Sequence, residues 1–389
     1  MHEERMIYLD NNATTPMDPA VAEAISAELV RGAANPSSQH AVGRAASGRL
    51  DAAVLEIGEA LDTDLSRPGG PRLILTSGGT ESNNLALSGL CESQSPLLVS
   101  QVEHSSVLAF ARQAERIGRR VEFLPVDSNG LVELEAIEAL LVDCGRSGSE
   151  PPVVSVLSAN NETGVVQPIE SIAQLCRSSG ASLHVDATQS FGKLHAPVES
   201  FHADAVTITP HKFHGPTGIG ALWLRAGVKL RPMLFGGEQQ LTTRPGTESV
   251  ALVTGMAKAL TIAVKEQPSA AHQMVELRDR FERRLLESGG DFLIHGRDVS
   301  RLPSTTCVSF KGTDRQAMLM ALDLAGIACS SGSACSSGSS PPSHVLQAMN
   351  VPSWALESAI RFGLSRFSTP KELDQAIPLI LSIYNRLRS

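Results

Sequence analysis

The regular alternation of short apolar runs with amphipathic segments is the feature that most constrains the fold of this chain. Amphipathic helices are predicted at residues 19–29, 41–61, 133–143 and 169–178, where Ala, Leu, Val and Ile recur at helical spacing. Buried strands are predicted at residues 72–76, 97–100, 121–126, 153–158, 182–186 and 205–208. Strands that alternate with helices in this way indicate an α/β fold, with a mainly parallel sheet and helices on both of its faces.

The chain has 389 residues, enough for one large domain and one smaller domain. A long helix is predicted from residue 249 to about 266, and the composition changes after Pro268. The region beyond predicts a smaller α+β domain with a helix at 275–286, a strand at 305–310 and a helix at 315–325. We therefore expect a large domain at 17–266 and a small domain formed by 1–16 and 267–389.

Composition excludes several classes of partner. The net charge of −8 and the pI near 5.8, without a run of Lys or Arg, argue against a nucleic-acid partner. An apolar segment of membrane-spanning length and an N-terminal signal are both lacking, so we expect a cytoplasmic protein without a membrane partner. The six cysteines do not indicate a disulfide framework in a chain of this size, and no metal site is expected.

Two stretches together indicate the chemistry. Lys212 follows the predicted strand 205–208 and precedes an apolar run at 218–224, so it is expected where water is scarce and a lysine can act as a Schiff-base amine. Asp186 stands at the C-terminal end of another predicted strand, where open α/β sheets place their ligand groups. A pyridoxal phosphate site needs both a lysine for the aldehyde and a carboxylate near the pyridine nitrogen. Taken alone, a lysine at a strand end has the plainer interpretation of a solvated surface residue.

Other strand ends carry polar groups that suit the same site. Gly79 and Thr80 open a predicted helix after a strand, which predicts a phosphate cradle, although a plain turn is the simpler alternative. His104 follows the next strand and can stack on a flat cofactor or cap a helix. Asn161 lies in an amide-rich turn that forms hydrogen bonds either to a ligand or locally. Arg361 alternates with apolar residues and suits either a substrate carboxylate, the interpretation we favour, or an internal acid.

A run of small residues carries two cysteines, Cys329 and Cys335, in a segment where Cys-Ser-Ser-Gly-Ser occurs twice. Such a segment has little to bury and predicts a mobile loop at about residues 328–341. Cys335 is the better candidate for an exposed nucleophilic thiol, because Cys329 follows an apolar stretch and is expected at the end of a strand. The alternative is a flexible linker with incidental cysteines.

These motifs together resemble the cysteine desulfurases, within the class V aminotransferase group of fold-type I pyridoxal phosphate enzymes. The resemblance covers nearly the whole chain, and its small-residue loop is similar to that of the subgroup with a flexible cysteine loop. The motifs that carry it are Tyr8-Leu9-Asp10 with Ala13-Thr14-Thr15-Pro16, Thr76-Ser77-Gly78-Gly79-Thr80-Glu81-Ser82-Asn83, Glu103-His104, Asn160-Asn161-Glu162-Thr163-Gly164, His184-Val185-Asp186-Ala187-Thr188-Gln189, His211-Lys212 and Ser331-Gly332-Ser333-Ala334-Cys335.

The resemblance implies a role for each matched residue. Lys212 would be the Schiff-base lysine, Asp186 the partner of the pyridine nitrogen, and His104 the residue stacked on the ring and an acid/base group. Gln189 and Asn161 would lie near the phenolic oxygen, with Asn161 also near the substrate. The phosphate ligands implied are Gly79, Thr80, Thr209 and His211, together with Thr247 from the second subunit of a homodimer. Arg361 would bind the substrate carboxylate, and Cys335 would take the sulfur.

The implied reaction converts L-cysteine to L-alanine and leaves a persulfide on Cys335, to be passed to an iron–sulfur scaffold protein or a sulfur carrier. Two alternatives stay open. One is a selenocysteine lyase or another class V aminotransferase-like enzyme, which would keep Lys212 and Asp186 but need not depend on Cys335. The other is a sulfur-carrier protein that binds partners and turns over slowly.

Three features of the sequence depart from the family pattern. Pro210 stands where the family often has a small residue, and the stretch 239–244 lacks the acid–arginine pair frequently seen there. The chain ends at Ser389, soon after its last predicted helix at 373–387, without the extended tail that some relatives use to dock a scaffold protein. The resemblance therefore leaves the identity of the sulfur acceptor open.

Overall fold

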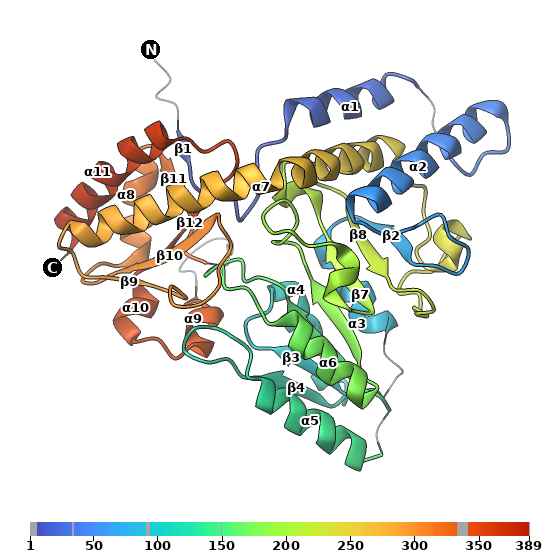
Figure 1. Cartoon of the computed structure of the whole chain (residues 1–389), viewed down its shortest axis with the longest axis horizontal. Helices are drawn as coiled ribbons and strands as arrows, with labels where there is room; N and C mark the ends of the chain where they lie inside the picture. The colour runs from blue at the N-terminus through green and yellow to red at the C-terminus, as the bar shows by residue number, and fades with distance from the viewer. Residues whose placement is uncertain (1–5, 33–34, 91–93, 149, 333–340, 389) are drawn as a thin grey trace.

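The computed structural model describes residues 6–32, 35–90, 94–148, 150–332 and 341–388. Figure 1 shows a larger part built around one sheet and a smaller part that contains both termini of the described chain, with a single long helix running across the two. No helix in these described ranges combines the length and the apolar composition needed to cross a bilayer.

The central sheet has seven strands in the order β2-β8-β7-β6-β5-β3-β4. Their bounds are β2 Arg72–Thr76, β3 Leu97–Ser100, β4 Val121–Leu124, β5 Val153–Leu157, β6 Ser182–Asp186, β7 Ala205–Ile208 and β8 Gly220–Leu224. Strand β8 is antiparallel to both of its neighbours, β2 and β7, whereas all other adjacent strands are parallel. The prediction of a mainly parallel sheet is confirmed.

Helices cover both faces of this sheet, because successive strand residues enter different apolar clusters. In β3, Leu98 packs in the cluster that holds Ile137 of α5, while Leu97 and Val99 pack with Val107 of α4. A strand buried on both faces is rich in apolar residues, as Leu97, Leu98 and Val99 of β3 are. The helices of this part are α1 Pro19–Leu29, α2 Ala41–Ala60, α3 Gly79–Gly89, α4 Ser105–Arg116, α5 Leu134–Arg146 and α6 Ile169–Ser179, with short 3-10 turns η1 Val198–Phe201, η2 Pro210–Lys212 and η3 Gln239–Thr242.

Helix α7, Val250–Glu287, corrects the prediction of two separate helices at 249–266 and 275–286. It is continuous for 38 residues with Pro268 inside it. A proline removes one helical hydrogen bond and frees the carbonyl four residues earlier, here that of Val264. Both Val264 and Pro268 are exposed, so water can satisfy that carbonyl and the helix continues.

The smaller part has its own apolar cluster, which joins Ile7 and Leu9 to residues between Ala270 and Tyr384. Its strands are β1 Ile7–Tyr8, parallel to β11 Ile327–Ala328, and an antiparallel sheet in the order β12-β10-β9, with β9 Phe292–Ile294, β10 Thr305–Phe310 and β12 Ala359–Gly363. Its helices are α8 Arg315–Leu324, α9 His344–Ala348, α10 Ser353–Glu357 and α11 Pro370–Leu387. The predicted boundary at 266 falls inside α7, and the division into two domains stays a prediction.

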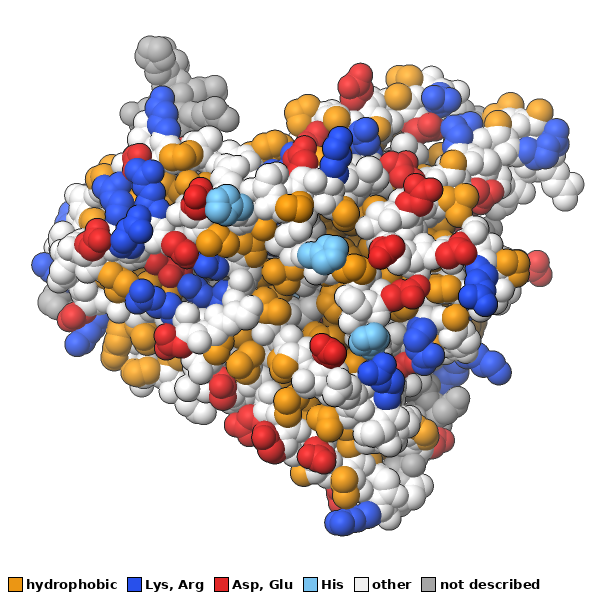
Figure 2. Space-filling model, viewed as in Figure 1, with side chains coloured by type: hydrophobic (Ala, Val, Ile, Leu, Met, Phe, Trp, Pro, Cys, Tyr) orange, Lys and Arg blue, Asp and Glu red, His pale blue; other side chains and the backbone are white. Residues whose placement is uncertain are grey.

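Ion pairs on α7 differ greatly in burial. Figure 2 shows that Lys and Arg side chains gather over the end of the molecule where α7 and α11 lie. In that region Arg280 of α7 pairs with Asp374 of α11 at 2.5 Å, and both side chains are partly exposed. Glu282 of α7 instead forms a bidentate pair with Arg301, at 2.8 and 3.0 Å, and each side chain is only 5% exposed.

We predict that Glu282→Ala lowers the free energy of unfolding by about 3–5 kcal/mol, because it leaves the guanidinium of Arg301 buried without a partner. The matched change Arg280→Ala breaks an exposed pair and is expected to cost less than about 1 kcal/mol. Urea unfolding of both variants, followed by fluorescence, measures the difference. Equal losses would contradict this assignment of the buried pair.

Candidate active site

A cavity of about 350 Å³ lies at the carboxyl ends of the parallel strands β5, β6 and β7. Open α/β sheets bind their ligands at this edge, because the loops that follow parallel strands meet there. All predicted site residues except Thr247 and Cys335 line the cavity: Gly79, Thr80, His104, Asn161, Asp186, Gln189, Thr209, His211, Lys212 and Arg361. Residues from the N-terminal segment and from the smaller part of the chain complete its wall.

Lys212 ends the turn η2, which connects β7 to β8. Its Nζ donates to the backbone carbonyls of Asn12 and Ala13, at 2.8 and 2.6 Å. The pKa of Lys212 is lowered to about 8, mainly by burial and to a smaller extent by the positive charge of Arg361. At neutral pH a larger fraction of this amine is therefore unprotonated, and nucleophilic, than of an ordinary lysine.

Asp186 is the last residue of β6, and fixed donors hold both of its carboxylate oxygens. Oδ1 accepts from the backbone N–H of Thr188 at 3.0 Å, and Oδ2 accepts from the side-chain amide of Asn83 at 2.8 Å. These hydrogen bonds stabilise the charged carboxylate and fix its orientation in the cavity wall. Asn83 belongs to a motif quoted for the family resemblance, but the sequence analysis assigned it no role.

Another part of the cavity wall suits an anion. Helix α3 begins at Gly79 without a side-chain cap, so its first N–H groups lack helical partners. A Cβ on Gly79 would lie 3.5 Å from Oγ1 of Thr188 and 3.7 Å from Cγ2 of Thr209. The side chains of both threonines therefore lie close to the start of α3. The buried hydroxyl of Thr209 has no hydrogen-bond partner among the described residues. A phosphate would provide the acceptor that this hydroxyl and these N–H groups lack.

Two histidines of the wall are neutral at physiological pH. His104 is exposed where it lines the cavity, yet burial by the surrounding protein lowers its pKa. Its Nδ1 accepts from the backbone N–H of Ser106 at 3.2 Å, so the neutral ring carries its proton on Nε2. His104 therefore both caps α4 and lines the cavity. Burial, and next the charge of Lys212, lower the pKa of His211 to about 4.

Arg361 of β12 is 3% exposed, and its side chain pairs with a carboxylate of this chain. One terminal nitrogen donates to Asp10 Oδ1 at 2.7 Å, and the other donates to the backbone carbonyl of Asn161 at 3.1 Å. Its Nε has no partner within the described ranges. The sequence analysis left the internal acid open as the alternative, and the structure identifies it as Asp10, while Arg361 also lines the cavity.

The two remaining predicted residues are not in the wall. Thr247 is exposed in the loop before α7. Cys335 lies outside the described residues, although Gly332, three positions earlier, lines the cavity. Cys329 follows β11, and burial, and next the charge of Asp10, raise its pKa to about 12. Cys329 therefore stays a protonated thiol, which is a poor nucleophile.

Glu103 is a further residue that the sequence analysis did not single out as functional. It is fully buried, and its Oε1 accepts from the backbone N–H of Leu157 at the end of β5. Burial, and next the charge of Asp186, raise its pKa well above the ordinary range. Only its place beside His104 in the sequence could have drawn attention to it.

The chain is similar to proteins named as cysteine desulfurases and to solved NifS-like proteins. The Aminotransferase class-V family matches residues 7–376. A cysteine desulfurase of Nostoc sp. (strain PCC 7120) is 40% identical over 387 residues, which cover 99% of this chain and 94% of that protein. A solved NifS-like protein from Rickettsia africae has a TM-score of 0.88 at 33% identity, covering 98% of this chain and 100% of that one.

A solved structure of SspA in complex with cysteine has a TM-score of 0.77 at 29% identity, covering 93% of this chain and 99% of that one. These similarities extend over nearly the whole chain, and they agree with the order of motifs found in the sequence. The chain is therefore a member of the Aminotransferase class-V family and belongs, within it, to the cysteine desulfurases.

Proposed function

We propose that this cysteine desulfurase uses pyridoxal 5'-phosphate to convert L-cysteine to L-alanine and transfers the sulfur to Cys335 as a persulfide. The observation that carries the proposal is the set of groups that line one cavity. The amine of Lys212 and the carboxylate of Asp186 lie in the same wall as the start of α3 and the hydroxyl of Thr209, which has no partner among the described residues. An aldehyde, a pyridine nitrogen and a phosphate fit these groups.

The residues that would hold the cofactor follow from this match. Lys212 would hold the aldehyde, Asp186 the protonated pyridine nitrogen, and His104 the ring face. The phosphate would be held by Gly79, Thr80, Thr209 and His211, with Thr247 of a second subunit. Bound there, the cofactor acts as an electron sink for the bond broken at the substrate Cα.

The chain's own residues then bind the substrate and move protons and sulfur. Arg361 would pair with the substrate carboxylate, beside Asn161. Lys212 has a pKa of about 8 and would take the Cα proton as a free amine. His104, neutral with its proton on Nε2, would exchange protons in the same cavity. The thiolate of Cys335 would attack the substrate sulfur, so that an S–S bond forms, the Cβ–S bond breaks and the Cβ takes up a proton to give alanine.

We also propose a homodimer, a cytoplasmic location and transfer of the persulfide to an iron–sulfur scaffold or a sulfur carrier. The loop that contains Thr247 favours the dimer. It exposes large apolar side chains, with Phe235 88% and Leu241 71% exposed. A second copy that covers this loop would remove these side chains from water and bring Thr247 to the neighbouring site.

We predict that Cys335→Ser lowers sulfide and alanine production from L-cysteine by at least about 100-fold while the absorbance of the bound cofactor is kept, because the sulfur loses its nucleophile. Cys329→Ser is the matched control, and it should keep most of the activity since Cys329 is a protonated thiol. Both products are assayed together with the spectrum. Unchanged activity of the Cys335→Ser variant would favour a selenocysteine lyase or another enzyme of this family.

We predict that Arg361→Gln raises the KM for L-cysteine by about 10- to 100-fold, because one charge-assisted hydrogen bond to the carboxylate is lost. Arg280→Gln, far from the cavity on α7, should leave KM unchanged. Steady-state alanine production gives kcat and KM separately. If the Arg361→Gln variant instead loses bound cofactor while its KM is unchanged, the role of Arg361 would be to hold Asp10 in place.

We predict that the cofactor-free protein takes up pyridoxal phosphate faster as pH rises, and that the rate levels off above about pH 8, because only the neutral amine of Lys212 attacks the aldehyde. The positive charge of Arg361 lowers this pKa, so Arg361→Gln should move the rise to higher pH. Rapid-mixing absorbance across a pH series measures both profiles. A midpoint near pH 10 in the unchanged protein would contradict the lowered pKa.

A further inference from the structure

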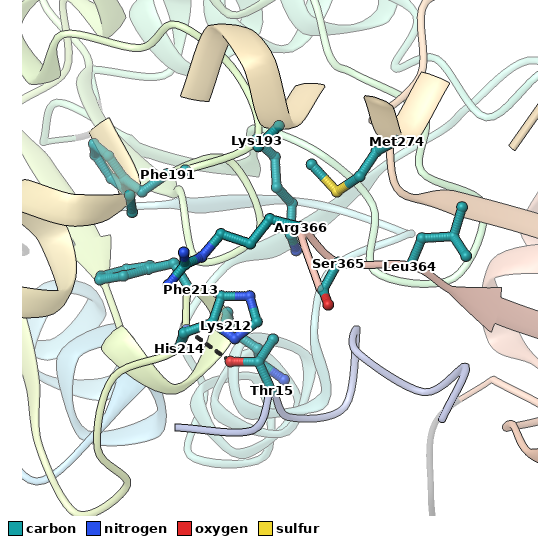
Figure 3. Close-up of a pocket in the computed structure, with 13 residues that line it drawn as sticks. Thr15, Phe191, Lys193, Lys212, Phe213, His214, Met274, Leu364, Ser365 and Arg366 are labelled. Carbon is teal, nitrogen blue, oxygen red and sulfur yellow. Dashed lines mark hydrogen bonds between the residues drawn. The ribbon is translucent and has the colours of Figure 1, made fainter. Parts of the chain in front are cut away.

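A buried lysine lies behind the cavity wall, and none of the roles above uses it. Lys193, in the loop after β6, is 5% exposed. Figure 3 shows its side chain between Phe191 and Met274, in the wall of a second pocket that Lys212 also lines. The space that it enters is lined mainly by apolar side chains, among them Phe213 and Leu364.

No carboxylate neutralises Lys193 within the described residues. The pKa of Lys193 is lowered to about 7, mainly by burial and to a smaller extent by the positive charges of Lys212 and Arg361. The other groups that face this space do not help. Arg366 is a cation already paired with Asp18 and Glu266, and burial lowers the pKa of His214 to about 4, which leaves that ring neutral. An unpaired buried cation lowers stability, so packing does not account for a lysine here.

The hydrogen bond that Lys193 makes is to the side chain of Gln189, which lines the cavity. Lys193 Nζ donates to Gln189 Oε1 at 2.5 Å. Gln189 Nε2 in turn donates to the carbonyl of Asn12 at 3.0 Å, and the same carbonyl accepts from Lys212. Lys193 therefore connects to Lys212 through one side-chain amide and one backbone carbonyl.

A glutamine amide can be turned through 180° to exchange its oxygen and nitrogen. The charged ammonium group of Lys193 has three donors and no acceptor, so it binds Oε1 of Gln189. Nε2 then faces the carbonyl of Asn12, which can only accept. Nε2 carries two hydrogens, and Asn12 uses one of them. The second remains for an acceptor on the cavity side of Gln189.

We propose that Lys193 is a positioning residue for the cofactor. By holding Oε1 of Gln189, it makes that side chain present an N–H to the cavity, which suits an anionic ring oxygen such as the phenolic oxygen of pyridoxal phosphate. This inference rests on the proposed cofactor. It adds a residue outside the cavity wall that acts only through Gln189.

The test is a pH titration of the absorption bands of the bound cofactor in the complete enzyme. Without the fixed donor, the anionic form of the ring oxygen loses a hydrogen bond, so its titration midpoint should rise. We expect Lys193→Met to raise the midpoint by about one pH unit, and Gln189→Ala to raise it by a similar amount. Lys265→Met, which removes an exposed lysine from α7, is the matched control and should leave the midpoint unchanged.

The double variant separates action through Gln189 from a direct effect of the lost charge. If Lys193 acts through Gln189, Lys193→Met adds almost nothing in the Gln189→Ala background. Two shifts that simply add would overturn the proposal. Urea unfolding separates a positioning role from a purely structural one. If Lys193 is a positioning residue, Lys193→Met should keep or raise the unfolding midpoint. If Lys193 is purely structural, the variant should be clearly less stable, and that result would count against the proposal.

The spectrum requires no sulfur chemistry, so the two proposals fail in different ways. A wild-type protein that binds the cofactor but releases neither sulfide nor alanine would refute the proposed function, while the midpoint shifts would still decide the role of Lys193. A wild-type protein that takes up no pyridoxal phosphate would overturn both.

Discussion

The hydrogen bonds from the Lys212 ammonium group to the carbonyls of Asn12 and Ala13 join the two parts of the molecule at the cavity. Lys212 follows a strand of the central sheet, whereas the N-terminal segment is tied to the smaller part by the Asn11 N–H, which donates to Gly363 of β12. Neither sheet alone therefore completes the site, and the first residues of the chain belong to the active site as much as the strand ends do.

The contact between the two parts also determines which charged groups surround the cavity. Burial and the charge of Arg361 lower the pKa of both Lys212 and Lys193, and the charge of Lys212 also lowers that of Lys193. Asp186 and Asp10 act on the pKa of Lys212 in the opposite direction. Burial and the neighbouring positive charge make Lys212 easier to deprotonate, as a nucleophile and base requires. The same excess of positive charge favours anionic ligands, so a phosphate and a carboxylate would relieve the repulsion that lowers these pKa values.

Sequence patterns predict the groups that follow strand ends, because topology alone brings them together. Asp186, Thr209 and Lys212 each stand at or just after a buried run, and parallel strands place such residues at one edge. The pair between Asp10 and Arg361 joins positions 351 residues apart, and no local period indicates it. The break predicted near Pro268 was wrong because helix propensity is local, whereas the exposure of that turn depends on tertiary packing.

A buried carboxylate of the larger part contacts the residues on either side of the segment that contains Cys335. Glu162, next to Asn161, is 1% exposed and accepts a hydrogen bond from the hydroxyl of Ser343. A Cβ on Gly332 would lie 2.8 Å from Oε2 of the same carboxylate, and its φ of +99° also requires glycine. One buried carboxylate thus contacts the chain on both sides of residues 333–340, beside the residue that the substrate is proposed to meet. The residues proposed to hold the cofactor follow strands of the central sheet, whereas Gly332 and Ser343, on either side of the segment with the proposed sulfur acceptor, contact Glu162. Under the proposed function, we therefore expect sulfur transfer to depend on this carboxylate as well as on the cavity wall.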